Sequence, residues 1–126
     1  IVLGLPLYGM RWRMSGPGLT TAVIGSGVTW VPNQHLDVLL GDGFYPGRDP
    51  IEISEVFWTR DGVDWLVTTY DSPATLRPKM ALARDNGLAG AGFWAMGYER
   101  GLPGFVELMT DFRNGDVART EAPTRQ

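Results

Sequence analysis

Two continuously apolar segments constrain the fold of this chain more than any other feature of its sequence. They cover residues 1–5 and 88–96. An unbroken apolar run, in contrast to an alternating one, is typical of a parallel strand that is covered on both faces. Parallel neighbours need a long crossover connection, and a helix normally supplies it in a βαβ unit. The sequence therefore predicts an α/β fold.

The segment before the second apolar run predicts the crossover helix. Asp71 or Ser72 can cap its N-terminus, and Pro73 suits the first helical position. Pro78 would lack one backbone hydrogen bond in a helix that begins at Pro73. A helix that begins at Thr75 avoids this loss, because Pro78 then lies in the first turn. We therefore expect the later start, and a last short helix after the second strand.

A long excursion separates the first strand from the crossover helix. It covers residues 14–70 and contains a hairpin signal, the Asp61-Gly62 step between expected strands at 52–59 and 63–70. A short helix is expected at 32–40. The sequence thus predicts a small α+β insertion within the βαβ unit.

Composition excludes several classes of protein. The chain has 126 residues, 44% of them hydrophobic, and a net charge of -3, which fits one globular domain without a basic surface for nucleic acid. It has no cysteine, so disulfides and thiolate metal sites are excluded. Its one histidine, His35, has no partner for a metal site or a nucleophile triad. Gly25-Ser26-Gly27 lacks the lysine of a phosphate loop and predicts a flexible turn. No apolar run approaches the roughly 20 residues that span a bilayer, so we expect no membrane partner, no metal and no cofactor.

Aromatic side chains follow both apolar strands. Tyr8 and Trp12 follow the first strand, and Phe93, Trp94 and Tyr98 stand at the end of the second. In parallel α/β folds, ligands bind at the carboxyl ends of the strands. Flat rings there suit the apolar C–H faces of sugars, and the neighbouring arginines can donate to sugar oxygens. The alternative is that the rings simply fill the core.

Two blocks of sequence resemble family 18 of the glycoside hydrolases, the chitinase family. LGLPLYGMRW is similar to the segment near the seventh strand of that family, where the strand runs into a Gly-x-Pro-aromatic-Tyr-Gly pattern. WLVTTYDSPATLRPKMALARDNGLAGAGFWAMGYE resembles the end of the same catalytic domain. The hairpin and the FWAMGYE ending resemble the bacterial branch with spore-cortex and cell-wall hydrolases.

The resemblance implies a (β/α)8 barrel with an α+β insertion after the seventh strand. Residues 1–13 and 71–116 would then form the last two βα units of an incomplete barrel. Residues 14–70 would be the insertion, and residues 117–126 a flexible tail. Because two lone parallel strands leave open edges, we expect the rest of a barrel or a second copy of the chain to cover them.

The resemblance also assigns candidate substrate-binding residues. Trp94 matches the eighth-strand tryptophan that forms the floor under the sugar being cleaved, and Tyr8 matches the tyrosine at the mouth of the seventh strand. Trp12 and Arg11 are candidates for the groove wall. Glu99 follows the floor strand and can line the groove, although a salt bridge within its loop is the favoured alternative.

The catalytic motif of the family is absent from this sequence. That motif is Asp-x-x-Asp-x-Asp-x-Glu, whose Glu is the general acid while the acetamide of the substrate is the nucleophile. The resemblance implies that the parent protein hydrolyses β-1,4-linked N-acetylglucosamine polymers, chitin or peptidoglycan glycan, with no catalytic residue on this chain, which alone should be inactive. A secreted or bacterial cell-wall location would follow. Two alternatives remain: a lectin-like barrel that binds glycans without cleaving them, and an independent α+β domain.

Overall fold

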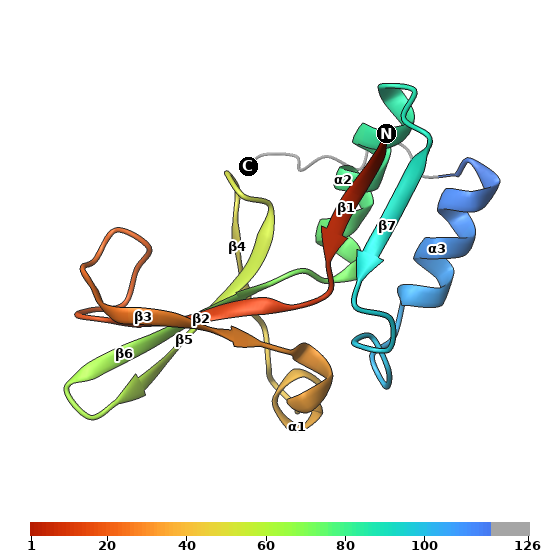
Figure 1. The fold of residues 1–126 in the computed structure, drawn as a ribbon. Coiled ribbons are helices and arrows are strands. Elements are labelled where there is room, and N and C mark those ends of the chain that lie inside the picture. Colours follow the sequence, from red (N-terminus) through yellow and green to blue (C-terminus); the bar gives the residue numbers. More distant parts are fainter. Residues whose placement is uncertain (117–126) are drawn as a thin grey trace.

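The computed structural model describes residues 1–116 and contains seven strands and short helices around two sheets (Figure 1). The predicted flexible tail, 117–126, lies outside the described residues. The elements are, in chain order, β1 (Val2–Pro6), β2 (Gly9–Met14), β3 (Val23–Trp30), the 3₁₀ helix η1 (Pro32–Gln34), α1 (Leu36–Leu39), β4 (Gly47–Asp49), β5 (Ser54–Asp61), β6 (Asp64–Tyr70), α2 (Pro73–Asp85), β7 (Gly90–Trp94) and α3 (Phe105–Asn114).

The first sheet is the predicted parallel pair. β1 and β7 are neighbours, in a register that places Pro6 opposite Trp94. In Figure 1 the two strands stand side by side, with α2 and α3 packed along them. The second sheet has the order β3-β2-β6-β5-β4 and is antiparallel throughout. It extends away from the foot of the parallel pair, so the chain leaves and rejoins the βα unit through the insertion.

Helix α2 begins earlier than the sequence predicted. The expected start at Thr75 is wrong, because the helix begins at Pro73 and contains Pro78. Ser72 is its N-cap: Ser72 Oγ accepts from the backbone N–H of Thr75 at 3.3 Å, and Thr75 Oγ1 accepts from the backbone N–H of Ser72 at 2.9 Å. This reciprocal cap satisfies N–H groups that a later start would leave open. It offsets the backbone bond that Pro78 lacks.

The main core lies between the parallel pair and the two helices. Its fully buried members come from β1, the turn after it, α2 and α3, and they are Leu5, Leu7, Leu76, Met80, Ala81, Phe105 and Leu108. Cations of α2 also tie the helices together, since Arg77 Nη2 donates to Asp111 Oδ2 at 3.0 Å and Arg84 donates to the backbone oxygen of Phe112.

The chain leaves the parallel pair directly after β1, because β2 belongs to the second sheet. Residues 9–13, which the sequence grouped with the barrel part, pair with β3 and β6 of the second sheet. Two local features explain the change of sheet. Pro6 has no N–H for a ladder, and a Cβ atom at Gly9 would collide with the backbone oxygen of Thr69. The domain boundaries themselves stay a prediction.

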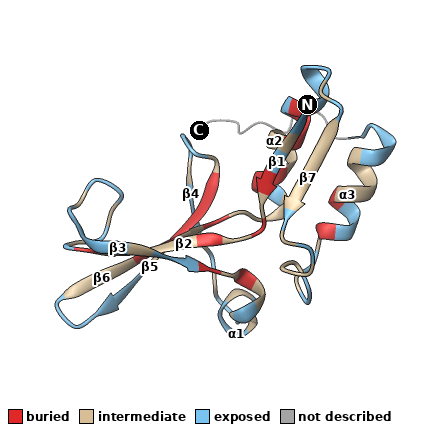
Figure 2. Ribbon diagram, in the orientation of Figure 1, coloured by how far each residue is buried: buried red, intermediate tan, exposed pale blue. Residues whose placement is uncertain are grey.

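The insertion confirms the hairpin and corrects two smaller predictions. β5 and β6 pair up to Asp61 opposite Asp64, and Gly62 turns the chain with φ of 65°. The expected helix at 32–40 is instead η1 followed by the four-residue α1. The expected flexible turn at 25–27 lies within β3, where the register with β2 shifts. Figure 2 shows that burial concentrates where the hairpin meets the rest of the chain, whereas its tip is exposed.

Candidate functional site

The carboxyl ends of β1 and β7 meet at a hollow with an exposed indole. The strands end side by side, and the backbone N–H of Leu7 donates to the backbone oxygen of Trp94 at 2.6 Å. The hollow is lined by Gly4, Leu5, Pro6, Tyr8, Gly92, Phe93 and Trp94. Because Gly4 and Gly92 have no side chains, the surface beside the indole stays open. Trp94 is 70% exposed, so its ring is available to a ligand.

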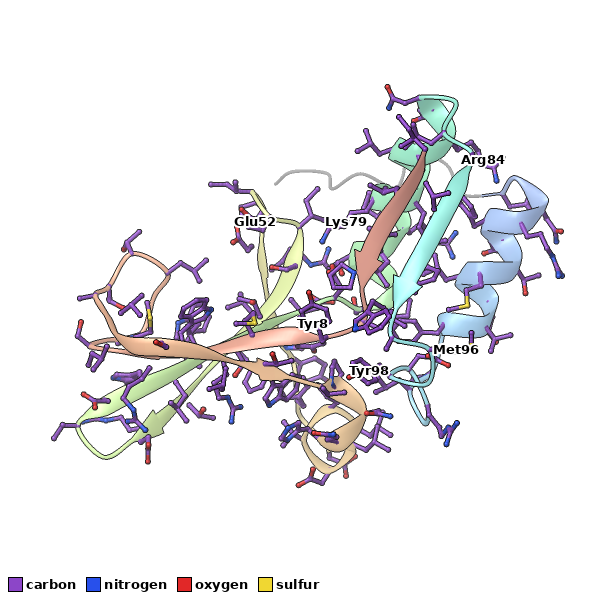
Figure 3. The ribbon with its side chains drawn as sticks, viewed as in Figure 1. Tyr8, Glu52, Lys79, Arg84, Met96 and Tyr98 are labelled. Carbon is purple, nitrogen blue, oxygen red and sulfur yellow. The ribbon has the colours of Figure 1, made fainter. Side chains whose placement is uncertain are left out.

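A second hollow adjoins the first and shares Tyr8 and Trp94. Its other lining residues are Met10, Thr29 and Tyr98. The walls thus come from β2 and β3 on one side and from the end of β7 and the loop after it on the other, two parts of the chain that are far apart in sequence. Figure 3 shows Tyr8 near the foot of β1, and Met96 and Tyr98 on the loop below β7. The structure therefore brings Tyr8 and Trp94 to one place and adds Tyr98, Thr29 and Met10 to it.

A third hollow lies on the other side of Tyr8 and has charged side chains in its lining. Its charged lining residues are Asp49, Glu52, Asp71 and Lys79. Lys79 Nζ donates to Asp71 Oδ1 at 2.6 Å, and the Asp71 side chain is only 8% exposed. The predicted cap at Asp71 is thus a partner of Lys79 rather than the N-cap. Sequence reasoning missed Lys79, because its role depends on the packing of α2 beside the insertion.

A buried carboxylate joins the insertion to α2. Glu55 accepts from Arg48 Nε at 3.0 Å, from Arg48 Nη2 at 3.1 Å and from Ser72 Oγ at 2.6 Å. Both carboxylate oxygens of Glu55 therefore have donors, so this carboxylate holds the cap of α2 in place and is not free to act as a proton donor. Burial, and secondarily the negative charge of Glu55, raises the pKa of Tyr70 to about 12.

Trp12 and Arg11 lie away from these hollows, on opposite faces of β2. Trp12 packs under Gly27, where a Cβ atom would lie 2.6 Å from Cε3 of the indole. Arg11 Nε donates to Thr68 Oγ1 at 2.7 Å, and its guanidinium lies 5.6 Å from the ring centroid of Trp30. Burial lowers the pKa of Arg11. Both side chains help to hold the second sheet together, and the structure does not bring either to Trp94.

Glu99 organises its own loop. Its Oε1 accepts from the backbone N–H of Gly97 at 2.9 Å, a hydrogen bond in place of the salt bridge that was favoured from sequence. His35 stacks on Trp30 with ring centroids 4.4 Å apart and an interplanar angle of 12°. Within residues 1–116, no three His, Asp or Glu side chains gather as a metal site would require. No helix in the same range is long and apolar enough to cross a membrane.

The fold and the site are those of an α/β protein that binds a ligand at the carboxyl ends of its parallel strands. Aromatic rings at the carboxyl ends of adjacent parallel strands are typical of the ligand-binding end of α/β barrels. The chain is 30% identical over 105 residues to a class V chitinase of Lotus japonicus, a match that covers 79% of this chain and 26% of that protein. A class V chitinase of Medicago truncatula is 25% identical over 105 residues. The chain thus spans about a quarter of the length of these relatives. No family model matches.

Solved structures show the same fold. The C-terminal domain of a putative chitinase from Desulfitobacterium hafniense has a TM-score of 0.65 at 21% identity, covering 88% of this chain and 34% of that one. A family 18 chitinase variant from Cycas revoluta, in complex with (GlcNAc)4, has a TM-score of 0.64 at 20% identity, covering 89% and 33%. A chitinase-like agglutinin from Robinia pseudoacacia has a TM-score of 0.56 at 23% identity, covering 91% and 32%.

These matches confirm the resemblance that the sequence predicted. The chain is a family 18 chitinase-like segment, and its two βα units are part of a (β/α)8 barrel with an α+β insertion between β1 and α2. Both curated relatives named above are plant proteins, and the assignment to a bacterial branch stays a prediction.

Proposed function

We propose that this chain forms part of a glycoside hydrolase that cleaves β-1,4-linked N-acetylglucosamine polymers, chitin or peptidoglycan glycan. One observation carries the proposal: the 70% exposed ring of Trp94 lies beside Tyr8 where two barrel strands end. The similarity to class V chitinases and the (GlcNAc)4 complex of the Cycas revoluta chitinase support a chitooligosaccharide as the ligand.

In this role, Trp94 is the floor of the sugar site. Its ring packs under the apolar C–H face of one sugar, and the Tyr8 phenol stands at the side of the same hollow. Tyr98 and Thr29 bound the adjoining hollow, which the next sugar would enter. Trp12, Arg11 and Glu99 were also predicted to bind substrate, but their contacts give them structural roles here, and we leave them out of the proposed site.

We assign the chemistry to residues outside this chain. The Asp-x-x-Asp-x-Asp-x-Glu motif is absent from the sequence, and the buried Glu55 is fully engaged by Arg48 and Ser72. A glutamic acid on another barrel strand would protonate the leaving oxygen while the substrate acetamide attacks the anomeric carbon with retention. The chain alone should therefore bind chitooligosaccharide and not cleave it. The remaining strands would cover the exposed side of β1, where Val2 is 58% exposed. A secreted or cell-wall location fits such a substrate.

A second candidate is glycan binding without hydrolysis. The structural similarity to a chitinase-like agglutinin favours it, since that protein shares the fold at a TM-score of 0.56. The two functions need the same aromatic floor and differ only in the catalytic glutamate.

The test compares the full-length protein that carries this chain with the 126-residue chain itself. Each is incubated with chitotetraose and with purified peptidoglycan, and products are identified by mass spectrometry while binding is followed by calorimetry. We expect cleavage by the full-length protein and binding without cleavage by the chain. Binding without cleavage by both would establish the second candidate. If the full-length protein binds neither glycan, both functions are wrong.

A further inference from the structure

The loop between β7 and α3 carries one wall of the hollow that is lined by Tyr8, Trp94 and Tyr98, here called the aromatic hollow, and is held by the insertion. This loop covers residues 95–104 and contributes Tyr98 to the hollow. Asn33, in η1, reaches across to it: Asn33 Nδ2 donates to the backbone oxygen of Gly97 at 2.9 Å, across 64 residues of sequence. We propose that Asn33 is a positioning residue that sets the width of the aromatic hollow by holding this loop against the insertion.

Gly97 is the residue of the loop that accepts the hydrogen bond from Asn33. Its backbone N–H donates to Glu99 Oε1 at 2.9 Å, while its oxygen accepts from Asn33. Its φ of 96° lies in a region that favours glycine. Gly97 is thus held by the insertion through its oxygen and by its own loop through its N–H, and its oxygen also accepts from the backbone N–H of Arg100 at 3.1 Å. Loss of the Asn33 bond would remove the tie to the insertion and leave the bonds within the loop.

The element that bears Asn33 is itself anchored. Pro32, at the start of η1, is buried, and His35 stacks on Trp30, which is 3% exposed. A second contact lies one turn further along, where a Cβ atom at Gly101 would approach Cδ1 of Leu36 to 2.8 Å. The donor amide therefore projects from a fixed part of the insertion onto the loop. The loop is also held by Tyr98 and Leu102, which pack against the main core. A rigid support of this kind is what a binding site needs to keep its geometry.

The position of this loop fixes the distance between Tyr98 and the other residues that line the hollow, Thr29 and Trp94. Thr29 lies on β3, a few residues before Asn33, and Tyr98 directly follows Gly97. Both line the hollow with Trp94. A loop that moves away from η1 therefore separates Tyr98 from Thr29 and widens the space beside the indole. This role rests on the proposed glycan-binding function.

The test uses Asn33→Asp, which keeps the shape of the side chain and replaces the N–H donor with an acceptor. Gln34→Glu is the matched control, because it makes the same chemical change at the next, exposed residue. Hydrogen exchange of the full-length protein is measured by mass spectrometry without ligand. We expect exchange over residues 95–104 to become about fivefold faster in Asn33→Asp, with the Gln34→Glu control unchanged.

The same variants are titrated with chitotetraose. We expect affinity to fall about fivefold for Asn33→Asp, with a melting temperature close to that of the wild type. Unchanged exchange over 95–104 overturns the role of Asn33, and so does faster exchange with unchanged affinity. A wild-type protein that fails to bind chitotetraose overturns the proposed function instead, and the affinity effect of Asn33 with it, while the exchange measurement still decides whether Asn33 holds the loop.

Discussion

Removing the indole of Trp94 should separate ligand binding from stability. The side chain of tryptophan presents roughly 200 Å², and Trp94 is 70% exposed. A sugar that covers one face would remove about 75 Å² of ring from water, which is worth about 2 kcal/mol. We therefore expect Trp94→Ala to weaken chitotetraose binding about 20-fold to 30-fold.

The expected cost in stability is smaller. The part of the ring already buried in the free protein is about 60 Å², worth at most about 1.5 kcal/mol because the unfolded chain also hides some of it. For a chain of 126 residues, that lowers the melting temperature by about 6 °C or less. Calorimetric titration measures the affinity for chitotetraose, and thermal unfolding followed by circular dichroism measures the melting temperature.

Trp65→Ala is the matched control for Trp94→Ala. Trp65 lies on β6 near the hairpin tip, where the guanidinium of Arg60 stands 5.3 Å from its ring centroid. The same truncation there should leave chitotetraose affinity unchanged. Wild-type affinity in Trp94→Ala would show that the exposed indole is not the floor of the site. Loss of both binding and cooperative unfolding would show that Trp94 belongs to the core.

Three further perturbations test the interior of the insertion. The raised pKa of Tyr70, about 12 against an ordinary 10, means that the folded state keeps the phenol proton at pH values where the unfolded state loses it. The free energy of unfolding should thus keep its full value below about pH 10 and fall by up to about 3 kcal/mol as the pH rises towards 12. Urea unfolding at a series of pH values should show this loss in the wild type and not in Tyr70→Phe. Glu55→Gln replaces the charged acceptor of Arg48 and should lower the unfolding free energy by about 1–3 kcal/mol in urea titrations; an unchanged midpoint would contradict the role of Glu55 as a tie. Gly27→Ala places a Cβ atom 2.6 Å from the ring of Trp12 and should cost about 1–3 kcal/mol with an altered near-ultraviolet dichroism spectrum, whereas an unchanged spectrum would mean that the ring moves aside freely.

Local signals in the sequence were read correctly where neighbours along the chain decide the structure. The unbroken apolar runs predicted the two parallel strands, and the Asp61-Gly62 step predicted the hairpin. The candidates Tyr8 and Trp94 could be named because both stand at or just after the ends of such strands. The start of α2 was misjudged although it is local, because the loss at Pro78 was weighed without the reciprocal cap between Ser72 and Thr75.

What the sequence by itself determined is therefore the kind of fold and the two rings at the ends of its parallel strands, because strand character and strand ends depend on residues within a few positions. Only the tertiary structure decided which side chains stand beside those rings. The alternation of β2 sends Arg11 and Trp12 to opposite faces of a sheet in which one partner strand, β6, lies more than fifty residues away, as the 57-residue separation of Arg11 and Thr68 shows. Tyr98 reaches the hollow through a loop held by Asn33. Such placements depend on register and packing between distant segments, which no local pattern records.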